Sequence, residues 1–73
     1  MNVSEAVAAA KKHIGDLFAA EPVRDLRMEE FLFDDHLGVW TITLGFNASS
    51  RPRDYRIVRV AESDKAVLSV TGR

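Results

Sequence analysis

The sequence predicts an α+β domain in which one N-terminal amphipathic helix packs on a three- to four-stranded antiparallel sheet, in the order α-β-β-β-β. Residues 3–18 repeat apolar side chains at helical spacing, whereas residues 39–46 alternate with period 2. Residues 55–60 and 66–71 continue in a β-rich style. A single amphipathic helix and a single small sheet can each bury an apolar face only against the other. We therefore expect the whole chain, residues 1–73, to form one domain.

The helix has a clear predicted start. Asn2 is the expected N-cap, with Glu5 as the reciprocal partner of a capping box, and Ser4 is the alternative cap. Gly15 lies inside the pattern and costs about 1 kcal/mol relative to alanine. The helix is expected to end at Pro22, because the residue before a proline is pushed out of the α region. The residues of the apolar stripe fall within about 120° on a helical wheel: Val3, Ala6, Val7, Ala10, Ile14, Leu17 and Phe18.

The first strand is expected at residues 24–33. Its alternation is broken at Glu29 and Glu30, as the one extra residue of a β-bulge would break it. A short helical turn through residues 27–32 is the alternative. Residues 34–38 carry the composition of a turn.

Residues 39–46 form the strongest predicted strand. Residues 47–54 are expected to be a loop, because Pro52 disfavours regular pairing there. Residues 55–60 and 66–71 then form a hairpin, whose tight connection requires antiparallel strands.

The alternation divides the expected sheet into two faces. The face beneath the helix is predicted to carry Phe31, Phe33, Trp40, Ile42, Leu44, Phe46, Val58, Val60, Leu68 and Val70. The other face is predicted to carry Leu32, Val39, Tyr55, Ile57 and Val67. Five sizeable apolar side chains on an open face favour an interface. The alternative is the ordinary preference of such residues for strands, whichever way they point.

Composition narrows the classes of partner. A chain of 73 residues without cysteine has no disulfide or thiolate zinc site to stabilise it, so we expect a homodimer. The net charge of −1 makes nucleic acid an unlikely partner and gives no reason to expect membrane binding. Residues 1–37 hold four Lys or Arg and eight Asp or Glu, whereas residues 38–73 hold six and three. This asymmetry is either chance or a bipolar surface that helps docking. No targeting segment precedes the helix, so a cytoplasmic location is expected.

No group of residues predicts catalysis, a metal or a cofactor. Asp34, Asp35 and His36 adjoin each other, but a solvated acidic turn explains them better than a metal site does. His13 is a lone helical histidine, and the four scattered glycines form no phosphate-binding loop. We therefore expect a protein that is not an enzyme.

One basic cluster is present in the sequence. Arginine binds carboxylate and phosphate groups through two parallel hydrogen bonds. The segment 51–59 therefore defines an alternative function, the binding of acidic ligands or nucleic acid. Its candidate contact residues are Arg51, Arg53, Arg56 and Arg59.

The segment 55–70, Tyr-Arg-Ile-Val-Arg-Val-Ala-Glu-Ser-Asp-Lys-Ala-Val-Leu-Ser-Val, follows a helix and earlier strands. In the order of its elements and the residue pattern of its last hairpin, the chain resembles the PepSY-like group of small α+β domains. The resemblance implies a helix paired with an antiparallel sheet that ends in a hairpin, and a stand-alone cytoplasmic relative. It transfers no site residues. Lys65 stands where a glycine is usual in the hairpin turn.

Together these observations predict a small non-enzymatic interaction or accessory module that acts through a sheet face or a sheet edge.

Overall fold

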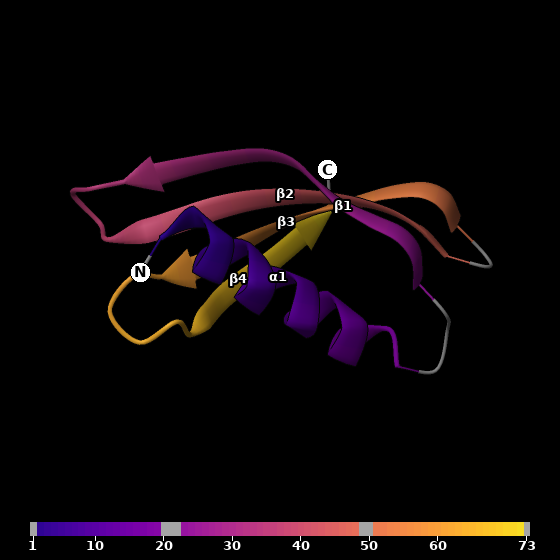
Figure 1. Cartoon of the computed structure of the whole chain (residues 1–73), viewed down its shortest axis with the longest axis horizontal. Helices are drawn as coiled ribbons and strands as arrows, with labels where there is room; N and C mark the ends of the chain where they lie inside the picture. Colours follow the sequence, from indigo (N-terminus) through magenta and orange to yellow (C-terminus); the bar gives the residue numbers. More distant parts are fainter. Residues whose placement is uncertain (1, 20–22, 49–50, 73) are drawn as a thin grey trace.

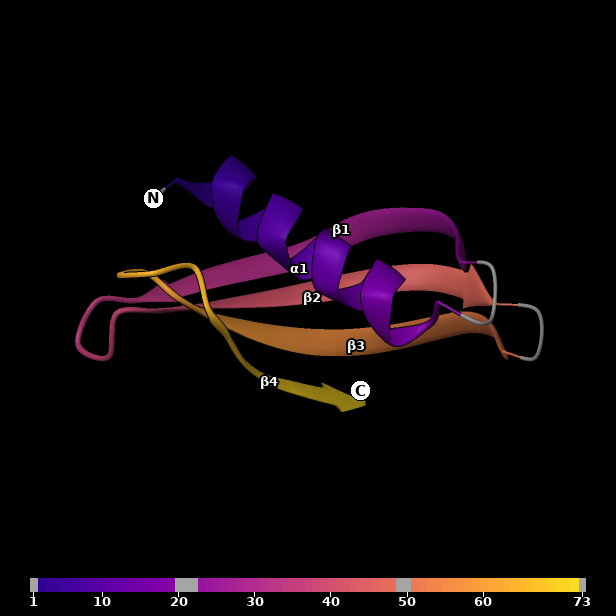
Figure 2. The same cartoon turned by 90° about the horizontal axis from the view of Figure 1, so that it is seen from below.

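The computed structural model describes residues 2–19, 23–48 and 51–72, with only the backbone at residues 51 and 52. It confirms the α-β-β-β-β order and the antiparallel sheet. The sheet has the strand order β1-β2-β3-β4, and α1 crosses one of its faces obliquely (Figures 1 and 2). The elements are α1 (Val3–Leu17), β1 (Val23–Asp34), β2 (Val39–Ala48), β3 (Arg51–Ala61) and β4 (Val67–Gly72).

The helix begins at the predicted capping box. The side-chain Oδ1 of Asn2 accepts a hydrogen bond from the backbone N–H of Glu5 at 2.9 Å, and the Asn2 N–H donates to Glu5 Oε1 at 3.0 Å. Two otherwise unpaired N–H groups are thereby satisfied. The helix ends at Leu17, earlier than predicted, and Pro22 lies outside the described residues.

The core lies under the middle of the helix. Three helical side chains are fully buried, Ala6, Ala10 and Ile14. The two alanines are small, so the helix backbone can lie close to the sheet. The sheet residues buried beneath them are Ile42, Leu44, Phe46, Val58 and Val60. These five were all predicted to lie on the helix-covered face.

The predicted bulge in β1 is confirmed, and the alternative of a helical turn is wrong. Met28 pairs with Leu44 and Glu30 pairs with Thr43, so Glu29 is the extra residue. A second register shift, between Arg24 and Arg27, was not predicted.

The loop expected at residues 47–54 is largely strand. β2 continues to Ala48, which pairs with Arg51 at the start of β3. The register shifts between Phe46 and Ala48, opposite the stretch that contains Pro52. Bulges are among the few places where a sheet accepts proline. The expectation that Pro52 interrupts the strand is therefore wrong.

The predicted faces of β4 are corrected by a further shift. Val67 pairs with Val60 and Ser69 pairs with Arg59, so Leu68 is the extra residue. Val67 therefore lies on the helix side, against the core, and Leu68 is exposed. Lys65, in the turn before β4, has a φ of 61°, in the left-handed region that glycine adopts most easily.

An ion pair ties the start of the helix to the β3–β4 turn. Lys65 Nζ lies 2.9 Å from Glu5 Oε2. This hydrogen bond, together with the one from the Asn2 backbone, lowers the pKa of Glu5 below its usual value. Within the residues that the structure describes, no helix has the length and apolar character to cross a bilayer.

The packing predicts unequal costs for two substitutions in the same helix. Ile14→Ala should lower the free energy of unfolding by about 2–5 kcal/mol, because it leaves a cavity under a fully buried site. Leu17→Ala is the matched control, since Leu17 is exposed, and it should change that free energy by less than about 1 kcal/mol. Urea unfolding followed through the single tryptophan measures both values. Equal losses would contradict the core as described.

Candidate protein-interaction surface

The edge strand β1 carries apolar side chains that the helix leaves uncovered. The strand order places β1 at one edge of the sheet, with β2 as its neighbour. Phe31 and Phe33 pair with Ile42 and Trp40, so they lie on the helix side as predicted. They nevertheless remain 49% and 40% exposed. The β1–β2 hairpin projects past the N-terminal end of α1, so no helix lies above this part of the sheet (Figure 1).

These two rings and Trp40 form an aromatic cluster. The Phe33 and Trp40 ring centroids lie 4.8 Å apart, and those of Phe31 and Trp40 lie 6.4 Å apart, both in tilted arrangements. Such contacts contribute about 0.5–1.5 kcal/mol beyond area burial. The indole N–H of Trp40 donates a hydrogen bond to the Glu62 carboxylate. The cluster is therefore held in place on its Trp40 side, while its phenylalanine side is open.

The hairpin adds exposed apolar residues of its own. Leu32, on the face away from the helix, is 67% exposed, and Leu37 in the turn is also exposed. We refer to Phe31, Leu32, Phe33 and Leu37 as the apolar arm. Several large exposed apolar side chains gathered on one hairpin of a small domain typically mark an interaction site.

Hydrogen bonds fix the turn at the end of this arm. Asp34 Oδ1 accepts from the N–H groups of His36 at 3.0 Å and Leu37 at 3.1 Å. Gly38, at a φ of 64°, donates its N–H to the Asp34 carbonyl. The carboxylate of Asp34 thus organises the turn. Among the described residues, no three His, Asp or Glu side chains gather as a metal ion would require.

A shallow groove of about 390 Å³ lies between the helix and β1. Its lining is mainly apolar and consists of Val3, Ser4, Val7, Ala8, Lys11 and Met28. Met28 lies in the same strand as the apolar arm, on the same side as Phe31. The groove and the arm therefore lie along one edge of the molecule.

The five residues predicted to share an open apolar face do not form a continuous exposed patch. Leu32 is exposed, but Val39 is buried, and Tyr55 and Ile57 are half-buried. Val67 lies on the helix side, for the reason given above. On the face away from the helix, Leu32 is thus exposed as the sequence predicted, and Tyr55 and Ile57 remain partly exposed there.

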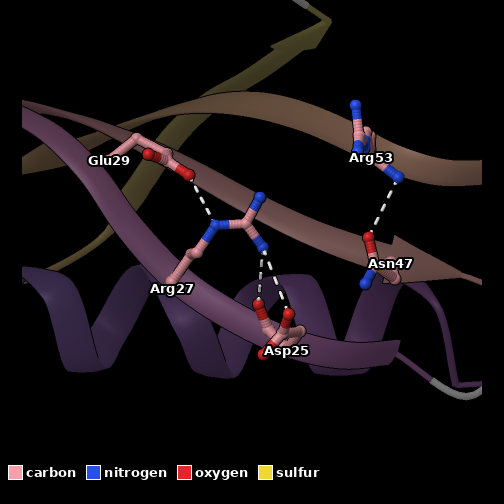
Figure 3. A network of polar contacts seen from close by, with 5 residues as sticks. All are labelled: Asp25, Arg27, Glu29, Asn47 and Arg53. Carbon is pink, nitrogen blue, oxygen red and sulfur yellow. Dashed lines mark hydrogen bonds and ion pairs between the residues drawn. The ribbon is translucent and has the colours of Figure 1, made fainter.

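Part of the open face is occupied by polar side chains. Arg27 Nε donates to Glu29 Oε1 at 2.6 Å, and Arg27 also contacts the carbonyl and the carboxylate of Asp25 (Figure 3). The hydrogen bond to Glu29 raises the pKa of Arg27. A Cβ at position 45 would lie 2.8 Å from Glu29 Oε1 and 3.1 Å from Tyr55 Cε1, so Gly45 provides the space for this network.

The candidate arginines are separated in space. Arg56 lies on the helix side, 2.6 Å from Asp54 and with its guanidinium 5.7 Å above the Phe18 ring. Arg59 is exposed, on the opposite face of the strand from Arg56. Arg53 is exposed as well, with a φ of 61° and its backbone N–H bonded to Asn47 Oδ1 (Figure 3). The side chain of Arg51 lies outside the described residues. Arg56 and Arg59 therefore point to opposite faces of the sheet and do not converge on one ligand position.

No protein-family model matches this sequence, and neither a curated protein nor a solved structure matches it significantly. The site therefore rests on the geometry of this chain. Sequence reasoning placed the aromatic residues on the correct side of the sheet but assumed that the helix would cover them. The expected lengths of the helix and of the hairpin already indicated that the helix is too short to cover these residues.

The crowding at Gly45 predicts a clear penalty for a side chain there. Gly45→Val should lower the free energy of unfolding by about 1 kcal/mol, at the low end of overpacking costs, because the Glu29 and Arg27 side-chain ends can shift and the Tyr55 ring must give way. Gly15→Ala is the control, since nothing lies within 4 Å of a Cβ at that helical position. It should raise stability by about 0.5–1 kcal/mol. Chemical denaturation compares the two variants, and an unaltered Gly45→Val protein would contradict the network.

Proposed function

We propose that this chain is a non-enzymatic protein-interaction module whose binding surface is the free edge of β1 together with the apolar arm. The observation that carries the proposal is a run of three consecutive exposed apolar residues on an edge strand, Phe31, Leu32 and Phe33. An edge strand offers unpaired backbone N–H and C=O groups to another chain. Apolar side chains on both of its faces add contact area to those hydrogen bonds.

Two features distinguish this edge from a loosely packed strand. The arm is ordered by the Asp34 turn and by the bond from Trp40 to Glu62. A pre-organised surface loses less conformational entropy when a partner binds. The grooves of the described structure are shallow, and the one beside β1 has a mainly aliphatic lining. That lining suits the binding of apolar side chains.

The occupant of this surface is a protein segment, from a second copy or from another chain. The homodimer expected from the sequence belongs to this proposal, because a domain of 73 residues gains stability from a partner. A cytoplasmic setting is also part of it, supported by the lack of cysteine, since small secreted domains are typically rich in disulfides. The relationship to the PepSY-like group remains a proposal, supported by the helix-then-sheet order and the terminal hairpin.

Site-specific photo-crosslinking in cells tests the surface. Benzoylphenylalanine in place of Phe31 should give a discrete adduct with one protein, because the ring then lies at the interface. The same group in place of Lys12, on the exposed side of the helix, should give none. Light scattering over a concentration series then separates a second copy from another protein. An adduct pattern at position 31 no different from that at position 12 would overturn the proposal.

A second candidate, the binding of acidic ligands or nucleic acid, is favoured by one observation. Arg53 and Arg59 are exposed, and neither forms an ion pair within the described part of the chain. It receives less support than the apolar arm, because Arg56 is already engaged by Asp54.

Heparin chromatography tests this second candidate. If it holds, the chain should be retained at about 50 mM salt and released steeply as salt rises, because counterions compete for the anion. Arg53→Ala and Arg59→Ala should each shift elution to lower salt, whereas Lys12→Ala should have little effect. Passage through the column without retention at low salt would exclude this function.

A further inference from the structure

Building on the proposed function, we infer that the β1 edge takes up an extended segment of another protein as a fifth strand. The geometry points to a segment with three apolar residues between two basic ones. The argument uses residues 30–34, their charges and the neighbouring groove.

Residues 30–34 are the regular part of the edge strand. They pair one for one with β2, from Glu30 opposite Thr43 to Asp34 opposite Val39. The two register shifts of β1 lie before this run, between Arg24 and Arg27 and at Glu29. A bulged edge resists further pairing, whereas a regular one accepts it. Residues 30–34 are thus where another strand can be added.

The side chains of this run alternate between the two faces of the sheet. Phe31 and Phe33 lie on the helix side, and Glu30, Leu32 and Asp34 lie on the other. A strand of five residues beside them places its middle residue next to Leu32 and its two ends next to the carboxylates. Its second and fourth residues lie beside the phenylalanine rings. Three central apolar residues and basic ends therefore match this edge.

The charged Lys, Arg, Asp and Glu residues in and around the apolar arm are all acidic. The sequence has no lysine or arginine from residue 28 to residue 50, but it has four acidic residues there. Glu29 is neutralised by Arg27 at 2.6 Å. Glu30 and Asp35 are exposed, and neither forms an ion pair within the described residues. Asp34 uses Oδ1 in its turn and retains a second carboxylate oxygen.

The same carboxylates disfavour a second copy at this edge. Two copies that pair antiparallel about Leu32 place Glu30 of each opposite Asp34 of the other. Like charges directly opposite each other destabilise a strand pair. Registers shifted along the strand leave part of the apolar run unpaired. The β1 edge thus disfavours its own copy and favours a strand with basic ends.

The groove beside Met28 adds a further contact. A bound segment that continues past Glu30 reaches Met28, whose neighbours in the groove include Val3 and Val7. The volume of about 390 Å³ can accept an apolar side chain from that end of the segment. Pockets of this kind select side chains in strand-addition complexes, while the backbone bonds supply affinity.

Titration with two synthetic peptides tests the inference. One has the order Thr-Lys-Val-Ile-Val-Lys-Thr, and the other has glutamate in place of both lysines. Backbone amide shifts in the ¹⁵N spectrum locate the binding site. We expect shifts at residues 30–34 and about a tenfold preference for the lysine peptide, because two exposed ion pairs replace two repulsions. This preference should decrease as salt rises.

Charge reversal at one end of the run provides the matched test. In Glu30→Lys one end attracts and the other repels each peptide, so the preference should fall to about parity. The substitution also makes the edge complementary to a second copy, and light scattering should show new dimer. Asp16→Lys makes the same charge change on the far side of the helix, where Asp16 pairs with Lys12, and should keep the tenfold preference.

The outcomes separate this inference from the proposed function. Equal binding of both peptides at residues 30–34 would overturn the basic specificity and leave the interaction surface standing. An unmodified chain that dimerises through the arm would overturn the inference and support the proposed function. Absence of shifts at residues 30–34 with either peptide at millimolar concentration would overturn the fifth strand, and the crosslink at position 31 would then decide the function separately.

Discussion

One short helix has to cover a longer sheet, and the rest of the structure follows from that mismatch. α1 has 15 residues and is about 22 Å long, whereas β1 has 12 residues and, even with its two bulges, extends more than about 30 Å. The longest dimension of the molecule, 37 Å, runs along the strands of the sheet and exceeds the length of the helix (Figure 1). The fully buried residues therefore gather where α1 crosses the central strands. The hairpin beyond them is apolar on the helix side without any element above it.

This arrangement divides the stabilising interactions into two kinds. Ile14 over the central strands contributes through burial and close packing, where one lost side chain leaves a cavity. The hairpin depends instead on its pairing with β2, on the Asp34 turn and on the bond from Trp40 to Glu62. Those interactions satisfy polar groups without removing Phe31 and Phe33 from water. Because the arm is already ordered while it is uncovered, it loses little conformational entropy when a partner binds.

Much of the fold could be predicted from the sequence, because local rules determine it. The cap at Asn2 and the bulge at Glu29 follow from residue type and alternation. The shifts near Pro52 and Leu68 could not be predicted in the same way, since they depend on which residues of two strands come into register. The shift at Leu68 moved Val67 to the other face, because side chains alternate with period 2. Alternation also assigns Phe31 to a face, but it does not say whether anything lies above that face.

The acidic residues beside the apolar arm can be explained as protection of the exposed strand edge against pairing with identical chains. The same residues can also recognise a basic partner, so the two explanations do not exclude each other. Charges on an edge strand discourage pairing with identical chains. At Glu30 and Asp34 this protection takes a specific form, because the two carboxylates stand at the ends of a regular apolar run. Carboxylates that repel a strand with acidic residues at these positions attract a strand with basic residues there. A strand that only needed protection could have replaced Phe31 and Phe33 by polar residues at little cost to the core, since both rings are exposed and lie outside the buried cluster. The combination of exposed aromatic rings with flanking carboxylates therefore favours selective docking over protection alone.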